Sequence, residues 1–204
     1  LNSFIPELKF SVSRYKKVTD YLTDLSNAQI VKKNIDKKYL YKIEEFEFLP
    51  GVLNGLRWFK EAGYLLVIIT NQSGIGRGYY TEQQYYELEN WMLEKLEKAG
   101  AGIDAVYHCP HLPDAPIEKY RKMCNCRKPK KGMFEQAIKD YDIDVEESIV
   151  IGDKMRDLVL CENGITQGYL VYAADYGDKL LSNVHYVKGG IEQVAKEILG
   201  KGEN

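Results

Sequence analysis

The sequence lacks the features that would place the protein in a membrane, outside the cell or on a nucleic acid. It has no run of about 18 apolar residues, the length needed for a membrane span. Its formal net charge is -2 and its Lys and Arg residues are scattered, so no basic face for a nucleic acid is expected. No secretion signal follows Leu1. We therefore expect a cytoplasmic monomer with a small ligand and with no membrane or nucleic-acid partner.

Internal repeats, low-complexity tracts and Ser/Gly-rich linkers are also missing. With 204 residues, the chain is long enough for one ordinary domain and short for two. We predict one main domain over residues 34–204, preceded by an atypical segment over residues 1–33. Because the sequence begins with Leu1 and not with Met, it is also compatible with a fragment of a longer chain.

Short apolar runs alternate with helical patterns along the main domain. The run Leu65 to Thr70 is rich in β-branched residues, which is typical of a strand buried on both faces. Similar runs predict strands over 105–108, 148–152 and 169–172, and helical spacing predicts helices over 51–62, 81–99, 132–141 and 190–199. Thr81 and Gln84 form a capping-box pattern at the start of one helix. This alternation predicts an α/β fold with a parallel sheet, whose ligands bind beyond the carboxyl ends of the strands.

The first 33 residues do not follow this alternation. Apolar residues from Leu8 to Leu25 recur at nearly helical spacing, so the pattern predicts an amphipathic helix from Pro6 to Leu25. On this interpretation the sheet lacks its opening strand.

Three of the four cysteines lie close together with a histidine. Cys109 and His111 are separated by one residue, as are Cys124 and Cys126, and twelve residues lie between the two pairs. Three thiolates and one imidazole complete a tetrahedral shell, so we predict a closed, structural zinc site. His108 is the competing imidazole, and free cysteines in a loop are the alternative to a metal site.

Three polar motifs follow the predicted strands or the cysteines. Thr70-Asn71-Gln72-Ser73-Gly74 offers a hydroxyl and a tight Gly-containing turn to a phosphate, or it is simply a polar turn. Asp153 and Lys154 follow the run SIVIG, where a carboxylate can hold Mg²⁺ or cap a helix. Arg127 and Lys128 directly follow Cys126 and suit phosphate binding, although a solvated basic loop has the same composition.

Together, TNQSGIGRGYY, CPH with CNCRKP, and IGDKMRD resemble the haloacid-dehalogenase (HAD) superfamily, in particular its D-glycero-D-manno-heptose 1,7-bisphosphate 7-phosphatase branch. Histidinol-phosphate phosphatases share the zinc loop. The resemblance covers about residues 34–199 and implies a Rossmann-like sheet flanked by helices, and hydrolysis of a sugar phosphomonoester through an aspartyl-phosphate with Mg²⁺. It also suggests a step in making the heptose precursor of a bacterial surface glycan, such as lipopolysaccharide.

The resemblance assigns roles to individual residues of this chain. It implies that Thr70 and Lys128 stabilise the phosphoryl group and that Asp153 holds Mg²⁺. It also implies a set of substrate-binding residues, namely Asp36, Tyr39, Asn71, Gln72, Ser73, Arg127 and Lys154. Cys109, His111, Cys124 and Cys126 match the family's zinc ligands.

The family's Asp-x-Asp-Gly nucleophile motif has no counterpart in this sequence. Extending the match backwards without gaps puts Ala28 and Ile30 at the two Asp positions, and neither side chain can attack phosphorus or carry a proton. A shift of four residues would recruit Asp24 as the nucleophile. Two hypotheses therefore stay open: an active phosphatase, or a dead or truncated relative that acts only as a phosphate-binding or interaction module.

Overall fold

The structure, a computed structural model, describes residues 17–19, 39–171 and 181–201. Its six strands are β1 (Lys17–Thr19), β2 (Leu65–Asn71), β3 (Ala105–Cys109), β4 (Ser148–Gly152), β5 (Gln167–Val171) and β6 (Val184–Val187). Its α-helices are α1 (Val52–Glu61), α2 (Ser73–Gly76), α3 (Glu82–Lys98), α4 (Gly132–Tyr141) and α5 (Ile191–Leu199). Four 3₁₀ helices complete the described part: η1 (Ile43–Glu45), η2 (Glu118–Tyr120), η3 (Met155–Asp157) and η4 (Val159–Asn163).

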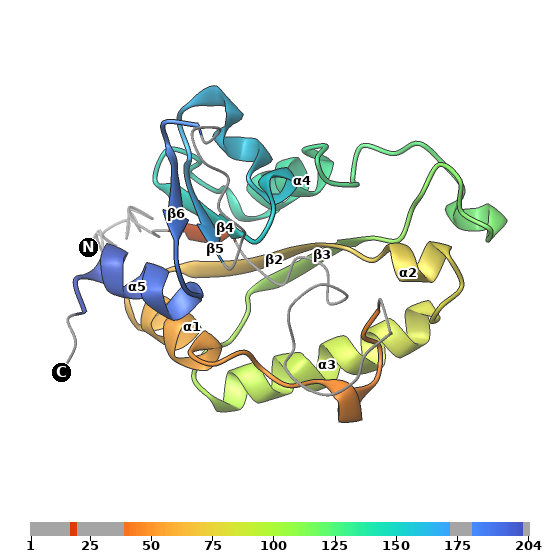
Figure 1. Ribbon diagram of the computed structural model, residues 1–204, viewed down its shortest axis with the longest axis horizontal. Coiled ribbons are helices and arrows are strands. Elements are labelled where there is room, and N and C mark those ends of the chain that lie inside the picture. The colour runs from red at the N-terminus through yellow and green to blue at the C-terminus, as the bar shows by residue number, and fades with distance from the viewer. Residues whose placement is uncertain (1–16, 20–38, 172–180, 202–204) are drawn as a thin grey trace, which may run out of the picture.

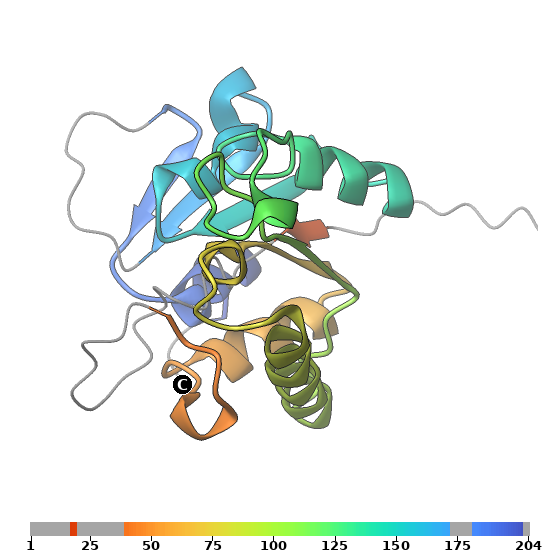
Figure 2. The ribbon, with the colours of Figure 1, turned by 90° about the vertical axis from the view of Figure 1, so that its right-hand side faces the viewer.

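The strands form one sheet in the order β3-β2-β1-β4-β5-β6, and every neighbouring pair is parallel. Helices α1, α3 and α5 lie below the sheet in Figure 1, and α4 lies above it. The view turned by 90° shows the same two layers of helices around the sheet (Figure 2). This is the doubly wound arrangement, in which the chain reverses direction across the sheet beside β1.

Strand β2 contributes side chains to the core on both sides of the sheet, because successive side chains of a strand point to opposite faces. Leu66 and Ile68 pack in the cluster that includes residues of α1, α3 and α5, while Val67 and Ile69 pack in the cluster that includes α4 and η4. By the same alternation, Thr70 follows the α3 side and Asn71 follows the α4 side. The end of β2 therefore presents polar groups toward both layers.

The structure confirms the parallel α/β sheet and the strands and helices expected over residues 51–171 and 190–199. Thr81 caps α3 as expected, because its hydroxyl accepts from the Gln84 amide and the Gln84 side chain accepts from the Thr81 amide. Strand β6 was not expected from the sequence. It is short, and its His185 and Tyr186 are exposed, so it has no continuous apolar run.

The prediction of a helix from Pro6 to Leu25 is wrong for Lys17–Thr19. Residues Lys17–Thr19 form β1, which pairs with β2 on one side and β4 on the other, so the sheet does have a central opening strand. The apolar spacing alone could not reveal this, because pairing on both sides of a strand depends on residues distant in the sequence. The rest of the expected helix lies outside the described residues.

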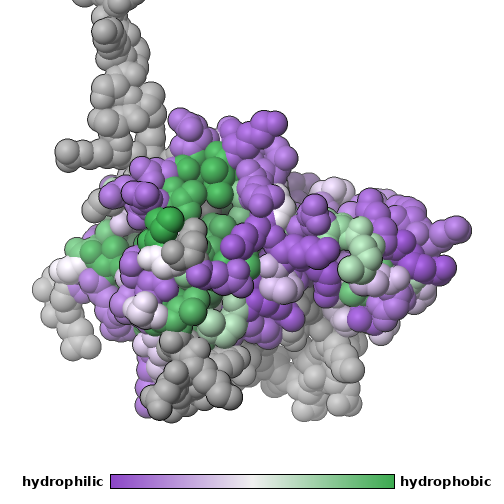
Figure 3. Space-filling view, turned by 90° about the horizontal axis from the view of Figure 1, so that it is seen from above, coloured by the Kyte–Doolittle hydropathy of each residue, from purple (hydrophilic) through white to green (hydrophobic). Residues whose placement is uncertain are grey.

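On the α4 side, the described surface mixes hydrophilic and hydrophobic residues (Figure 3). Among the described helices, none is long and apolar enough to cross a membrane. Seen from the α4 side, hydrophilic residues surround an area of hydrophobic ones (Figure 3). Apolar groups are common on protein surfaces, so this mixture alone identifies no partner.

One carboxyl group is buried within the α3 layer. The Glu89 side chain accepts a hydrogen bond from the Tyr85 hydroxyl at 2.6 Å, and the residue is 8% exposed. Burial raises the pKa of Glu89 above its ordinary value of 4.5, and the Tyr85 hydrogen bond only partly opposes this. At pH values between the pKa of Glu89 in the unfolded chain and its raised pKa in the folded protein, the folded protein therefore holds a proton that the unfolded chain has lost.

We predict that Glu89 makes the fold less stable as the pH rises through its raised pKa. The free energy of unfolding of Glu89→Gln, minus that of the wild type, should increase as the pH rises from the ordinary pKa of 4.5 through the raised pKa of the folded state, because the glutamine has no charge to bury. Urea unfolding at several pH values measures this difference, with the exposed Glu87→Gln on the same helix as a control. A difference that falls with pH would contradict the prediction.

Candidate functional site

The carboxyl end of β2 is joined to the loop that precedes α4 by a pair of reciprocal hydrogen bonds. The Asn71 side-chain amide donates to the Lys128 carbonyl at 3.1 Å, and its Oδ1 accepts from the Lys128 amide at 3.0 Å. Both residues are buried. Asn71 therefore fixes the backbone of Lys128, and both the nitrogen and the oxygen of its side-chain amide take part in this contact.

Lys128 carries its charge into the interior of the molecule. Its Nζ donates to the Ile69 carbonyl at 2.6 Å and lies 2.9 Å from Oδ1 of Asp157, with both side chains 1% exposed. Burial raises the pKa of Asp157, and the Lys128 charge acts in the opposite direction. This pair ties the end of β2 to η3, which follows β4.

Asp157 also organises the loop after β4. Its Oδ2 accepts the Lys154 amide at 3.1 Å, and the Asp153 carboxylate pairs with Lys154 Nζ at 3.0 Å. A Cβ at Gly152 would lie 2.5 Å from the Asp157 Cβ, so only glycine allows this close approach. Asp153 thus lies directly after the strand end, half-buried, with a carboxylate suited to a hard cation such as Mg²⁺.

The Thr70 hydroxyl lies in a hydrogen-bonded series with two other buried side chains. Gln72 Nε2 donates to Thr70 Oγ1 at 2.9 Å, and the Tyr80 hydroxyl donates to Gln72 Oε1 at 2.6 Å. Ser73 begins α2 and is also buried. The motif expected to bind phosphate is thus an ordered turn held by its own side chains.

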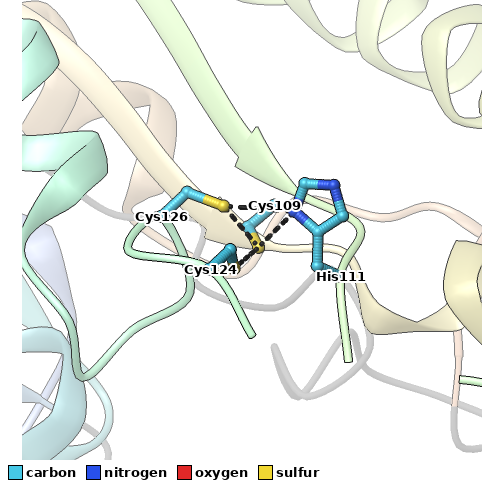
Figure 4. A group of neighbouring side chains, drawn as sticks. All are labelled: Cys109, His111, Cys124 and Cys126. Atoms are coloured by element: carbon cyan, nitrogen blue, oxygen red, sulfur yellow. Dashed lines mark hydrogen bonds between the residues drawn. The ribbon is translucent and has the colours of Figure 1, made fainter. Parts of the chain in front are cut away.

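The four expected metal ligands lie together where the two ends of the long segment between β3 and α4 meet, Cys109 and His111 from one end and Cys124 and Cys126 from the other (Figure 4). Their donor atoms all lie within 4.8 Å of one another. Cys109 Sγ is 3.6 Å from both His111 Nδ1 and Cys124 Sγ, and 3.0 Å from Cys126 Sγ. The edges of a tetrahedral zinc–thiolate shell are about 3.8 Å, so the cluster is near the size that zinc requires. Burial raises the pKa of the Cys109 thiol, so a cation is needed to favour the thiolate there.

His108, the competing imidazole, does not lie in this cluster. Its ring packs against Tyr85 and Tyr86 of α3, with ring centroids 4.6 and 5.5 Å away. Burial lowers the pKa of His108, although Glu82 partly opposes this. A neutral ring in an aromatic contact is therefore a packing residue.

The remaining expected site residues are placed less centrally. Arg127 donates from Nη1 to the His111 carbonyl at 3.4 Å, which links it to the cysteine cluster. The Tyr39 ring lies 4.7 Å from that of Tyr79, beside the turn after β2. Asp24 and Asp36 lie outside the described residues. Sequence reasoning passed over Asp20, the residue that follows β1 in the sequence, because it assigned this segment to a helix.

The arrangement has the chemistry of a site for a phosphate ester. A hydroxyl, a buried ammonium group and a carboxylate follow or approach the carboxyl ends of β2 and β4, which flank β1. Ligands of doubly wound sheets bind at this edge. The cysteine cluster offers four donor atoms, the number that fills a tetrahedral shell around a metal ion.

Comparison with known proteins identifies the family. The family described as "Polynucleotide kinase 3 phosphatase" matches residues 19–166. The chain belongs to this phosphatase family. It is therefore by family a phosphoric monoester hydrolase, and the expected relationship to HAD-type phosphatases is confirmed.

The chain is 49% identical over 130 residues to a D-glycero-beta-D-manno-heptose-1,7-bisphosphate 7-phosphatase of Haemophilus ducreyi, covering 63% of this chain and 71% of the other. It is 45% identical to the corresponding alpha-heptose enzyme of Photorhabdus laumondii, covering 68% and 76%. A crystal structure of D,D-heptose 1,7-bisphosphate phosphatase from B. bronchiseptica, complexed with magnesium and phosphate, aligns with a TM-score of 0.71, 26% identity and coverage of 90% and 97%.

We predict that the phosphatase domain is strongly destabilised when Lys128 loses its partner. Asp157→Ala should lower the free energy of unfolding by about 3–5 kcal/mol, because a buried ammonium group would remain uncompensated. The double variant Lys128→Met/Asp157→Ala should be less destabilised than the single one. Urea unfolding measures both, with the more exposed Asp153→Ala as the control. A loss under about 1 kcal/mol for Asp157→Ala would contradict this account.

Proposed function

We propose that this chain is a phosphatase of the heptose 1,7-bisphosphate type, which removes one phosphate from a sugar bisphosphate. The observation that carries the proposal is the tie between the three motifs: Lys128 contacts the Ile69 carbonyl beside Thr70 and also contacts Asp157, which holds the loop of Asp153. The identity to enzymes named for this substrate supports the choice of sugar.

In this mechanism a carboxylate of the N-terminal segment attacks phosphorus and forms an aspartyl-phosphate, and the bond between phosphorus and the sugar oxygen breaks. The sugar oxygen takes up a proton from water. Water then hydrolyses the acyl phosphate. The Thr70 hydroxyl donates a hydrogen bond to a phosphoryl oxygen, and the positive charge of Lys128 stabilises the negative charge that develops there. Mg²⁺, when bound, neutralises charge on the phosphoryl oxygens, and Asp153 offers an oxygen ligand for it.

The nucleophile is proposed from the sequence. Asp24 is one candidate, and Asp20 is the second because it directly follows the central strand, as the family's nucleophile does. The second position after Asp20 is Leu22, which cannot act as the acid and base. Neither carboxylate restores the complete Asp-x-Asp-Gly motif.

This incomplete motif favours a second candidate function, a phosphate-binding or interaction module without catalysis. The same residues, Thr70, Arg127 and Lys128, would then bind a sugar phosphate that is not hydrolysed. The proposal includes a cytoplasmic location, because reduced thiols in that compartment remain available to a metal. It also includes a step in making the heptose precursor of a surface glycan. Substrate binding is assigned to the other polar residues that the resemblance names, namely Asp36, Tyr39, Asn71, Ser73, Arg127 and Lys154, whereas the Gln72 side chain contacts Thr70 and Tyr80.

We predict that phosphate release from D-glycero-D-manno-heptose 1,7-bisphosphate requires Mg²⁺ and is lost in Asp20→Asn or in Asp24→Asn, whichever is the nucleophile. Loss of the attacking group should lower the rate at least about 10³-fold. A colorimetric phosphate assay measures release, with Asp144→Asn, an exposed residue outside the site, as the control.

If no phosphate is released, thermal unfolding with the same bisphosphate decides between the two functions. A ligand that binds only the folded state must raise the melting temperature. A rise without turnover would identify the binding module, and no rise would reject both functions.

We also propose that Cys109, His111, Cys124 and Cys126 bind a structural zinc ion. Purified protein should contain about one zinc per chain, and Cys126→Ser should lose most of it together with thermal stability. Cys161→Ser is the matched control, because Cys161 is a buried free cysteine away from the cluster. Elemental analysis measures the metal, and equal zinc content in the two variants would reject the site.

A further inference from the structure

Gln72 lies in the middle of the motif expected to bind phosphate, yet its side chain is enclosed by protein. The residue is 1% exposed, and both ends of its amide have protein partners, Thr70 and Tyr80. A side chain with this little exposure is not placed to contact a substrate directly. Its interactions instead act on the Thr70 hydroxyl.

The two distances fix which way the amide points. The 2.6 Å contact at Tyr80 has the length of an O–H···O bond, and the 2.9 Å contact at Thr70 has that of an N–H···O bond. Tyr80 thus donates to Gln72 Oε1, which turns Gln72 Nε2 toward Thr70. Thr70 Oγ1 accepts this bond, so its own hydrogen must be donated in another direction.

We propose that Tyr80 and Gln72 are positioning residues that orient the Thr70 hydroxyl as a hydrogen-bond donor to the phosphoryl group. This inference rests on the proposed function. A threonine hydroxyl can rotate and can either donate or accept. Because Gln72 Nε2 donates to Thr70 Oγ1, the Thr70 hydroxyl acts as a donor toward its next partner, which is the role that a negatively charged phosphoryl oxygen requires.

The position of Tyr80 is itself fixed by packing. Its ring stacks on Tyr41, with centroids 5.5 Å apart and an angle of 12° between the planes. On another side it lies against Gly74, where an added Cβ would be 2.1 Å from the Tyr80 ring. The absence of a side chain at Gly74 therefore lets Tyr80 reach Gln72.

A double-mutant cycle tests this coupling with inorganic phosphate in the presence of Mg²⁺. Tyr80→Phe and Thr70→Val should each weaken phosphate binding about fivefold to tenfold, measured by calorimetry. In the Thr70→Val background, Tyr80→Phe should have almost no further effect, because both changes remove the same donated hydrogen bond. Equal losses in the two backgrounds, or none from Tyr80→Phe, would overturn the proposal.

Tyr85→Phe is the matched control for the loss of a buried tyrosine hydroxyl. Tyr85 also donates a 2.6 Å hydrogen bond, but to Glu89 of α3. Removal of the Tyr85 hydroxyl should lower the thermal stability, because it leaves the Glu89 side chain without this donor. It should leave phosphate affinity within about twofold of the wild type, as expected of a merely structural change. If Tyr85→Phe and Tyr80→Phe weakened phosphate binding equally, the specific role of Tyr80 would be rejected.

A second measurement does not depend on phosphate. The Gln72 side-chain amide signal, assigned in a nitrogen–proton NMR spectrum by its loss in Gln72→Met, should exchange slowly with water and shift in both Tyr80→Phe and Thr70→Val. A wild type that binds no phosphate would count against the proposed function, and this signal then decides the positioning role. An amide signal unchanged by either substitution would overturn it.

Discussion

The arrangement of the site depends on the buried pairing of Lys128 with Asp157. These two residues come from segments that follow different strands, and the Ile69 carbonyl adds a third contact at the end of β2. Burying two charges is costly, so such a pair is weak evidence for stability alone. Here the pair fixes the separation between the ends of β2 and β4. The positions of the polar groups at those strand ends, including Thr70 and Asp153, therefore depend on this ion pair.

The cysteine cluster is connected to the same framework through the backbone. The Gln72 amide donates to the Cys109 carbonyl at 2.8 Å, and the Gly132 amide at the start of α4 donates to the Asn125 carbonyl at 2.9 Å. The loop that carries the cluster therefore reaches both the turn after β2 and the segment of Lys128. A metal held by this loop would order groups that it does not itself contact, which is how a closed site can matter to a distant one.

Local patterns in the sequence predicted most elements and the membership of the cysteine cluster, because strand runs, caps and ligand pairs are set by near neighbours. The Thr81 cap and the pair of Cys124 with Cys126 are of this kind. The interactions that depend on distant segments were not predictable in the same way. The central position of Lys17–Thr19 and the burial of Gln72 between two side chains arise only from the fold. The family resemblance implied that Gln72 lines the substrate, whereas its buried side chain is bonded to Thr70 and Tyr80.

Strand β1 has a consequence for how the two halves of the sheet hold together. Its described residues pair in parallel with β2 on one side and with β4 on the other, so β2 and β4 have no direct backbone contact in the sheet. A strand between two neighbours can leave the sheet only if both ladders break together. Removal of Lys17–Thr19 would therefore divide the sheet into two smaller ones, β3-β2 and β4-β5-β6. The buried ion pair of Lys128 and Asp157, which reaches the ends of β2 and β4, would then be a side-chain link between them.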